Sequence, residues 1–326
     1  MKRRRALLLG LAALASPLAA RAQSGRRIPR IGFLSLQSPE SDPRLESFLT
    51  GMRELGYVEG KTIVIEWRFS RGKTEPLSGY AAELVQLKPE LIVAVHPQAV
   101  EAVRRLTSTI PIVFAVGQDP VGMGFAKSLA RPGGNITGHS SMSADMGVKH
   151  IELLRSAMPK CSRVAVLLNP TNPQGAAVLR NAFEAAGRKF GVSVDFLEAR
   201  SDEEIEKAFI AAKKGRADAV VVAPDGFFFE ERALIARSAI RQRLPSVFLQ
   251  RESVAAGGLF SYGPDGREQY RRTAYYVHRI LNGAKPGDLP IEQPTKFEMI
   301  VNLKTAKALG IKIPPAVLSR ADELIQ

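Results

Sequence analysis

The sequence is poor in cysteine, histidine and tryptophan. Its 326 residues contain one cysteine, Cys161, together with four histidines and one tryptophan. A single cysteine cannot form an internal disulfide, so the fold must be held by its core even in an oxidising compartment. Cys161 precedes the apolar run Val164 to Leu168, which favours a partly buried structural thiol over a catalytic one.

The motifs of common enzyme classes are also missing. The sequence has no His-Glu-x-x-His, no Walker lysine loop and no Gly-x-Gly-x-x-Gly that opens a helix after a strand. The segment Gly138-His139-Ser140-Ser141-Met142 has part of the nucleophile-elbow pattern, but its last glycine is missing and no placed acid accompanies it. The sequence therefore predicts no metal, no cofactor and no enzyme.

No segment of the sequence has the ~18 consecutive uncharged apolar residues that a membrane-spanning helix needs. A short apolar run, Ala6 to Ala15, follows Lys-Arg-Arg-Arg and leads through Pro17 to Ala20-Arg21-Ala22. This pattern is typical of a signal peptide, which we place at residues 1–22. No cysteine stands at the cleavage point to carry a lipid. We therefore expect a freely diffusing periplasmic monomer without stable membrane insertion, exported by the general or the twin-arginine route.

The chain is basic, with 46 Lys and Arg against 32 Asp and Glu. Cleavage after Ala22 removes five basic residues and no acid, which lowers the net charge from +14 to +9. Basic proteins invite comparison with nucleic-acid binders. Here the positive residues are scattered among acids, as in Glu203 to Lys207, and no basic stripe with interleaved aromatics occurs. We expect a solvated surface and no nucleic-acid partner.

The length and the hydrophobic pattern predict two α/β lobes. The 304 residues that follow the leader exceed the size at which one core stops growing, ~250–300 residues. Short β-branched runs alternate with longer segments of 3.6-residue periodicity, which indicates βαβ units and parallel sheets. Strands are expected at residues 30–35, 63–68, 91–95, 112–115, 136–138, 164–168, 193–197, 219–223, 246–249 and 259–262. Helices are expected at residues 43–55, 76–87, 98–106, 121–129, 146–158, 174–190, 202–214, 229–241 and 266–281.

Six segments cover nearly the whole chain after the leader in a characteristic order: residues 48–61, 109–115, 129–138, 257–265, 292–298 and 301–310. Together they resemble the ABC-transporter substrate-binding family related to tryptophan- and other aromatic-amino-acid-binding proteins. The resemblance implies a type I periplasmic-binding fold, with two flavodoxin-like (Rossmann-like) lobes and three interlobe crossings. It also implies a small-molecule ligand in the interlobe cleft, and ABC permease and ATPase subunits as partners.

Turn-rich stretches suggest where the chain crosses between the lobes. The candidates are Ser140 to Ala144, Ala255 to Ser261 and Gly283 to Thr295, with hinges expected near Ser140, Ala256 and Pro286. We accordingly expect lobe 1 to comprise residues 28–141 and 262–284, and lobe 2 to comprise residues 142–261 and 285–326.

Open parallel sheets bind ligands at the carboxyl ends of their strands, so the loops there supply the candidate ligand contacts. In lobe 1 these are Ser35, Gln37, His96, Gln98, Gln118 and Asp119, with Ser140 and Ser141 at the first crossing. Ser35 and Gln37 either contact the ligand or form a plain strand-to-helix turn. His96 stands where similar proteins carry small residues, and it either narrows the pocket or caps its own turn. Asp119, before Pro120, caps a helix, binds an ammonium group, or does both.

In lobe 2 the candidates are Asn169, Thr171, Asn172, Asp225, Phe227 and Glu252. Thr171 or Asn172 caps a helix opened by Pro173, and helix N-termini favour anions. Asp225 is a candidate partner for an ammonium group and Phe227 for an apolar or aromatic ligand body, or else the phenylalanines form the buried face of the following helix; we assign Phe228 to the core. Glu252 contacts the ligand or belongs to a hinge or surface ion pair with Arg251.

Acidic groups at Asp119 and Asp225, opposite donor-rich loops, suit a zwitterion. The sequence therefore predicts a binding protein for an amino acid or amine-bearing acid, with the aromatic amino acids following from the resemblance alone. Two other interpretations stay open, a ligand-sensing module that feeds a signalling partner and an exported enzyme.

Export is expected to leave a chain that begins at Gln23. Mass spectrometry of the protein recovered from the periplasmic fraction tests the cleavage site directly. A chain that still begins at Met1 and sediments with the membranes would contradict both the signal peptide and the free periplasmic state.

Overall fold

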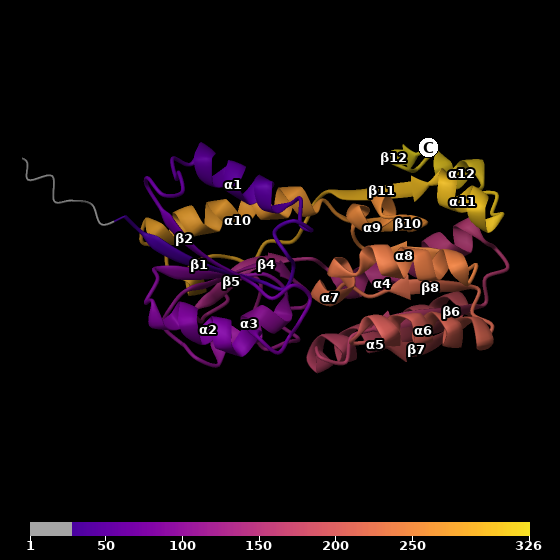
Figure 1. The fold of residues 1–326 in the computed structure, drawn as a ribbon, viewed down its shortest axis with the longest axis horizontal. Helices are drawn as coiled ribbons and strands as arrows, with labels where there is room; N and C mark the ends of the chain where they lie inside the picture. The colour runs from indigo at the N-terminus through magenta and orange to yellow at the C-terminus, as the bar shows by residue number, and fades with distance from the viewer. Residues whose placement is uncertain (1–27) are drawn as a thin grey trace, which may run out of the picture.

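The computed structural model describes residues 28–326, so the expected leader lies outside the described residues. Two lobes lie side by side along the longest axis, and the C-terminus lies on the second of them (Figure 1). Within residues 28–326 no helix combines the length and the apolar character that crossing a bilayer requires.

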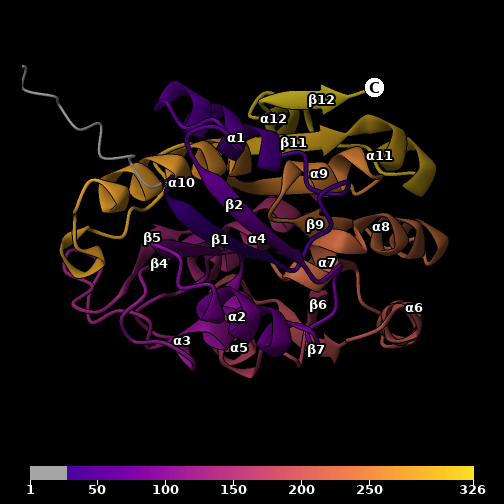
Figure 2. The ribbon, with the colours of Figure 1, turned by 60° about the vertical axis from the view of Figure 1, so that its left-hand side comes forward.

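Lobe 1 is built on a five-stranded parallel sheet of order β2-β1-β3-β4-β5. Its strands are β1 (Arg30–Ser35), β2 (Val64–Phe69), β3 (Leu91–Ala94), β4 (Ile112–Gly117) and β5 (Ile136–Ser140). The helices α1 (Leu45–Glu54) and α10 (Gly266–Leu281) cover one face, and α2 (Leu77–Gln86) and α3 (Pro97–Arg104) cover the other (Figure 2). Tyr270, Ala274 and Val277 form an apolar stripe along α10 that is buried against α1 and the sheet.

Lobe 2 is built on a seven-stranded sheet of order β12-β11-β10-β9-β8-β6-β7. Its strands are β6 (Arg163–Leu168), β7 (Ser193–Glu198), β8 (Ala219–Val222), β9 (Ser246–Phe248), β10 (Phe260–Pro264), β11 (Phe297–Asn302) and β12 (Glu323–Ile325). All pairs are parallel except β10 with β11. The helices are α4 (Ser143–Ala157), α5 (Pro173–Phe190), α6 (Asp202–Lys214), α7 (Gly226–Glu230), α8 (Arg232–Arg241), α9 (Arg251–Ala255), α11 (Leu303–Leu309) and α12 (Pro315–Leu318).

Two helix predictions need correction. Residues 121–129 form turns instead of a helix, because the Asp119 carboxylate accepts a hydrogen bond from Gly122 N at 2.9 Å and Gly124 adopts a φ of +70°. The helix expected at residues 229–241 is two helices that meet at Glu231, and the first of them begins earlier, after the capping residue Asp225.

The chain crosses between the lobes after Ser140, between Pro264 and Gly266, and between Ile291 and Phe297. Ala256 lies away from the crossings, because Gly257, at a φ of +114°, leads from α9 into β10 within lobe 2. Pro286 also lies away from them, in the 3-10 turn Pro286–Asp288, where Thr137 Oγ1 of lobe 1 donates to the nearby Leu289 carbonyl at 2.8 Å.

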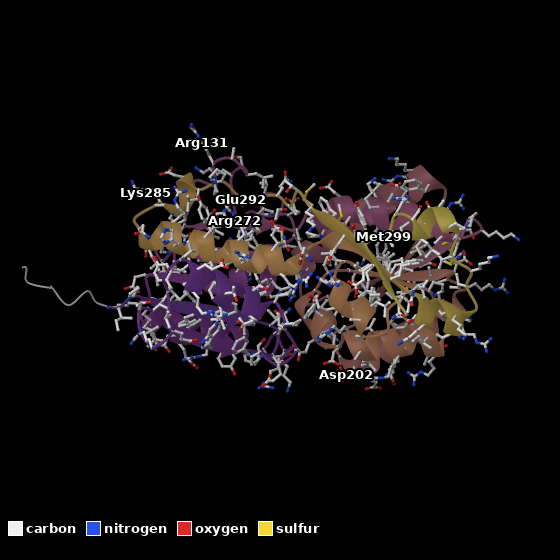
Figure 3. The ribbon with its side chains drawn as sticks, turned by 90° about the horizontal axis from the view of Figure 1, so that it is seen from above. Arg131, Asp202, Arg272, Lys285, Glu292 and Met299 are labelled. Atoms are coloured by element: carbon white, nitrogen blue, oxygen red, sulfur yellow. The ribbon has the colours of Figure 1, made fainter. Side chains whose placement is uncertain are left out.

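Strand pairing therefore places residues 262–264 in lobe 2, and packing places residues 285–291 with lobe 1, which differs from the expected boundaries. Arg272 of α10 holds Glu292 through two hydrogen bonds of 2.8 and 2.7 Å, and the two side chains lie together where the third crossing begins (Figure 3).

Gly138 in β5 offers a test of how tightly lobe 1 is packed. Its φ is +145°, and a Cβ atom there would lie 2.1 Å from the Phe114 carbonyl oxygen of β4. Gly138→Ala should lower the free energy of unfolding by ~2–4 kcal/mol, because it combines backbone strain with overpacking. Gly134→Ala, with no atom within 4 Å of the new Cβ, is the matched control. Equal urea midpoints for the two variants at equal m values would contradict the expectation.

Candidate functional site

The loops at the carboxyl ends of the strands meet across the two lobes. Gln98 Nε2 of lobe 1 donates to Asp225 Oδ2 of lobe 2 at 2.6 Å. Gln118 Nε2 donates to the Pro224 carbonyl at 2.8 Å, and Gln118 Oε1 accepts from Asn172 Nδ2 at 3.3 Å. These direct bonds show that the structure is a closed form, in which polar groups of one lobe satisfy those of the other.

Asp225 lies at the centre of this contact. Its Oδ1 accepts from Asn169 Nδ2 at 2.8 Å and from Phe227 N at 2.9 Å, which caps α7, while its Oδ2 accepts from Gln98. Burial raises the pKa of the Asp225 carboxyl, and the hydrogen bonds from Asn169 and Gln98 oppose that shift without cancelling it. A cation placed beside this carboxyl would favour its ionised form.

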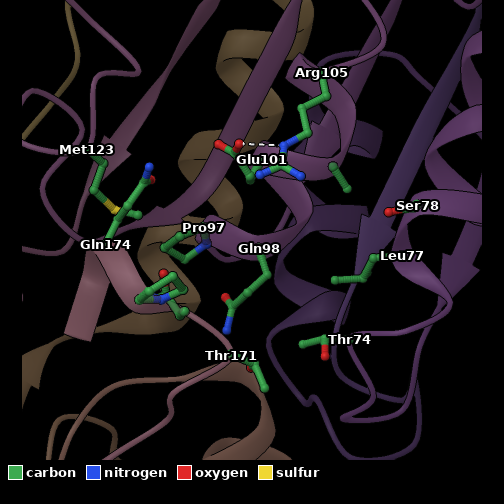
Figure 4. A pocket seen from close by; sticks show the side chains of 13 residues that line it. Thr74, Leu77, Ser78, Pro97, Gln98, Glu101, Arg105, Met123, Thr171 and Gln174 are labelled. Atoms are coloured by element: carbon green, nitrogen blue, oxygen red, sulfur yellow. Dashed lines mark hydrogen bonds and ion pairs between the residues drawn. The ribbon is translucent and has the colours of Figure 1, made fainter. Parts of the chain in front are cut away.

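Gln98 supplies a second acceptor at the same place. Its Oε1 atom is buried and has no hydrogen-bond partner among the described residues. The side chain lines a pocket of about 220 Å³ between the lobes and extends from α3 toward Thr171 of lobe 2 (Figure 4). A buried carbonyl without a donor loses the stabilisation that water would give it, so a ligand donor at this point would be favoured.

Three uncharged polar side chains form a hydrogen-bonded row just after β1 and β3 in lobe 1. Ser35 Oγ donates to Gln37 Oε1 at 2.8 Å, and Gln37 Nε2 lies 3.1 Å from Nε2 and 3.3 Å from Nδ1 of His96. All three side chains are buried. Burial lowers the pKa of His96 to about 3, and the charge of Arg44 adds to the shift, so the ring is neutral at physiological pH. His96 holds a φ of +73°, which is unusual for a side chain of this size.

Sequence reasoning missed a buried ion pair beside His96. Arg44 is 1 % exposed, and its Nε and Nη2 donate to the two Asp42 oxygens at 2.7 and 3.0 Å. Tyr270 OH donates to Asp42 Oδ2 at 2.7 Å, and the Arg44 guanidinium lies 4.0 Å from the ring centroid of Phe229 in lobe 2. The sequence signal was Asp42-Pro43-Arg44 directly before a helix, a pattern that an exposed helix start shows equally well.

The remaining predicted residues are hydrogen-bonded within lobe 1, buried, or partly exposed. Asp119 is bound to its own turn at Gly122, and Ser140 Oγ donates to the Gln118 carbonyl at 3.1 Å. Ser141 is buried, and Phe227 and Phe228 are both buried in the lobe 2 core. Glu252 is partly exposed at the start of α9, and its negative charge is a minor contribution that raises the pKa of Arg44 and of Tyr270.

A groove of about 580 Å³ continues from the buried contacts to the surface. Asn169, Thr171 and Phe227 line its inner part, and charged side chains from both lobes, including Arg71, Lys73, Arg200, Asp202 and Glu231, line its rim. Within residues 28–326 no three His, Cys, Asp or Glu side chains are grouped as a metal site would require. The arrangement presents buried acceptors, amide donors and aromatic rings between two lobes, which suits binding of a small polar molecule.

Comparison with known proteins points to one family. A family model described as ABC transporter substrate binding protein matches residues 34–325. A tyrosine-binding protein of Clostridioides difficile (strain R20291) is 26 % identical over 284 residues, which cover 86 % of this chain and 81 % of that protein.

Two solved structures share the fold over 91 % of this chain. A conserved domain protein from Vibrio cholerae has a TM-score of 0.86 at 27 % identity and is covered over 100 % of its length. A Streptococcus pneumonia domain in complex with L-Trp has a TM-score of 0.82 at 24 % identity and is covered over 99 %. These matches confirm the resemblance seen in the sequence and the expected fold of two α/β lobes.

The Asp42–Arg44 pair should govern stability in acid. Burial alone raises the pKa of Asp42, but the charge of Arg44 and the hydrogen bonds from Arg44 and Tyr270 outweigh it and lower the pKa overall. A carboxyl with a depressed folded-state pKa stabilises the fold above its unfolded pKa of ~3.9 and loses that contribution as the pH falls through the folded value. Asp42→Asn should cost ~3–5 kcal/mol at pH 7, because Arg44 stays buried without a counter-charge.

Asp195→Asn is the control, since Asp195 pairs with Arg163 at 3.1 Å while both side chains are 44 % exposed. It should cost no more than ~1 kcal/mol. Urea unfolding from pH 7 to pH 2.5 should show the difference between wild type and Asp42→Asn shrinking below pH ~4. A difference that does not depend on pH would contradict this role of Asp42.

Proposed function

The chain belongs to the ABC transporter substrate-binding protein family, and we propose that it is the periplasmic component of an importer. It captures an amino acid between its two lobes and delivers it to ABC permease and ATPase subunits. The family match and the two-lobed fold support the transport role, and the leader expected at residues 1–22 supports the periplasmic location.

The observation that carries the ligand class is the pair of buried acceptors at Asp225 and Gln98. The Asp225 carboxyl has a raised pKa and receives only neutral donors, and Gln98 Oε1 has no donor among the described residues. An ammonium group carries a positive charge and three donors, so it satisfies both acceptors at once. A neutral donor can form a hydrogen bond to the carboxylate but gives it no counter-charge.

The other groups of the cleft suit the rest of an amino acid. Thr171 and Asn172 line the pocket and come from the segment that leads into α5, whose N-terminus attracts a carboxylate. Phe227 lines the groove, so an apolar or aromatic side chain has a ring to pack against. The tyrosine-binding relative and the structure in complex with L-Trp point in the same direction.

Closure makes the binding energy depend on both lobes. The Gln98–Asp225 bond of 2.6 Å joins lobe 1 to lobe 2 in the place assigned to the ammonium group. A ligand there exchanges this bond for contacts of its own, and it favours the closed form only by what it gains there relative to the open form.

A thermal-shift screen of amino acids identifies the ligand, since a ligand at a hundred times its Kd stabilises by ~2.7 kcal/mol. Titration calorimetry of Asp225→Ala and Asp225→Asn then tests the charge assignment. Both should weaken binding ~10–150-fold, which corresponds to the ~1.5–3 kcal/mol of a hydrogen bond to a charged group. Asp225→Asn keeps an acceptor for Phe227 N, so it separates the charge from the helix cap.

Asp218→Asn is the matched control, because Asp218 also accepts from backbone N–H groups, those of Ser162 at 2.8 Å and Arg163 at 2.9 Å, but lies at the amino end of β6, opposite the strand ends that form the cleft. A second comparison uses the deaminated analogue of the identified amino acid, which should bind wild type weakly and Asp225→Asn no worse. If Asp225→Asn binds the amino acid as tightly as wild type, or if the ligand has no cationic group, the proposal is wrong.

A further inference from the structure

A second set of interlobe contacts lies apart from the ligand acceptors. Glu230, at the C-terminal end of α7, accepts hydrogen bonds from Ser38 of lobe 1, at 2.7 Å to Oε1 from Ser38 Oγ and at 3.0 Å to Oε2 from Ser38 N. Ser41 Oγ donates to the same carboxylate. Three donors from one loop of lobe 1 thus converge on one side chain of lobe 2.

The neighbouring residues support this contact from both sides. Arg232 donates from Nη2 to the Ser41 carbonyl at 2.8 Å and from Nη1 to the Phe229 carbonyl at 2.7 Å, so it ties the same loop to the α7 backbone. The lobes also approach closely here, since a Cβ atom at Gly226 would lie 2.7 Å from Leu36 Cβ. The loop that follows β1 is therefore fitted onto α7.

These contacts differ from the Gln98–Asp225 bond in what a ligand does to them. The Glu230 carboxylate accepts three donors, and both serine hydroxyls donate to it, so the set is satisfied within the protein. Bonds to a carboxylate are stronger than neutral ones, and these are partly buried. They form only when the lobes meet, and they need not be exchanged when a ligand enters.

We propose that Glu230 is a positioning residue for ligand capture, which fastens the loop of residues 38–44 onto α7 and holds the cleft closed with or without ligand. Contacts made only in the closed form shift the equilibrium toward it regardless of ligand, and they slow release because the lobes must part first. The release step rests on the proposed function, whereas the effect on closure does not.

Small-angle scattering without ligand tests closure, and stopped-flow dissociation of the identified amino acid tests release. Glu230→Gln should enlarge the radius of gyration of the ligand-free protein and raise the dissociation rate about tenfold, equivalent to about 1.4 kcal/mol. The association rate should change much less. Glu206→Gln is the control, because Glu206 pairs with Arg241 on the surface of lobe 2 and should change neither quantity.

The double variant Ser38→Ala with Ser41→Ala removes two of the donors from the opposite lobe and decides the question if Glu230→Gln fails to fold. Adding Glu230→Gln to it should produce little further change, because the three residues act as one set. If Glu230→Gln matches wild type in both the ligand-free radius of gyration and the dissociation rate, the proposal is overturned. If wild type binds no amino acid, the proposed function fails, and the scattering comparison alone still decides this role of Glu230.

Discussion

Closing two α/β lobes on each other removes polar groups from water, and each of them then needs a partner in the protein or the ligand. This constraint explains why Gln118 of lobe 1 contacts both the Pro224 carbonyl and Asn172 of lobe 2. It also explains why Gln98 Oε1, a buried acceptor without a partner among residues 28–326, is informative. Because the polar groups around it are paired within the protein, an acceptor left unpaired in the closed cleft indicates that the ligand supplies a hydrogen-bond donor there.

The charges between the lobes follow the same logic. The buried cation Arg44 is neutralised by Asp42, with Tyr270 as an additional donor, and the rings of Phe229 and Tyr270 flank its guanidinium. His96 is uncharged, because burial and then the charge of Arg44 lower its pKa to about 3. Among the residues that the structure describes, Asp225 is the other buried acid, and its hydrogen-bond donors are neutral. The ammonium group proposed beside Asp225 would complete the charge balance of the cleft, an argument that depends on Arg44 already being paired.

The sequence predicts most of the fold because β-branched runs such as Val164 to Leu168 and the stripe of α10 follow the periods of strand and helix. It did not predict β11, because Phe297–Asn302 follows a Pro- and Gly-rich stretch and pairs antiparallel to β10. Strand-end reasoning selected Gln98, Asn169 and Asp225, which the structure brings together. Arg44 and Glu230 were missed, because their partners Phe229 and Ser38 lie about 190 residues away in sequence and only the relative placement of the lobes joins them.

The two kinds of interlobe contact act on different quantities. A ligand at the proposed site would replace the Gln98–Asp225 bond, so its affinity would reflect the difference between its own contacts and those of the closed, empty protein. The bonds of Glu230 with Ser38 and Ser41 form in the closed protein whichever ligand is bound, so they do not distinguish one ligand from another and set instead how readily the lobes close and part. Ligand selectivity and lobe closure can therefore change independently of each other. A substitution near Asp225 alters which molecule is held, and one in the loop of residues 38–44 alters how long any of them stays.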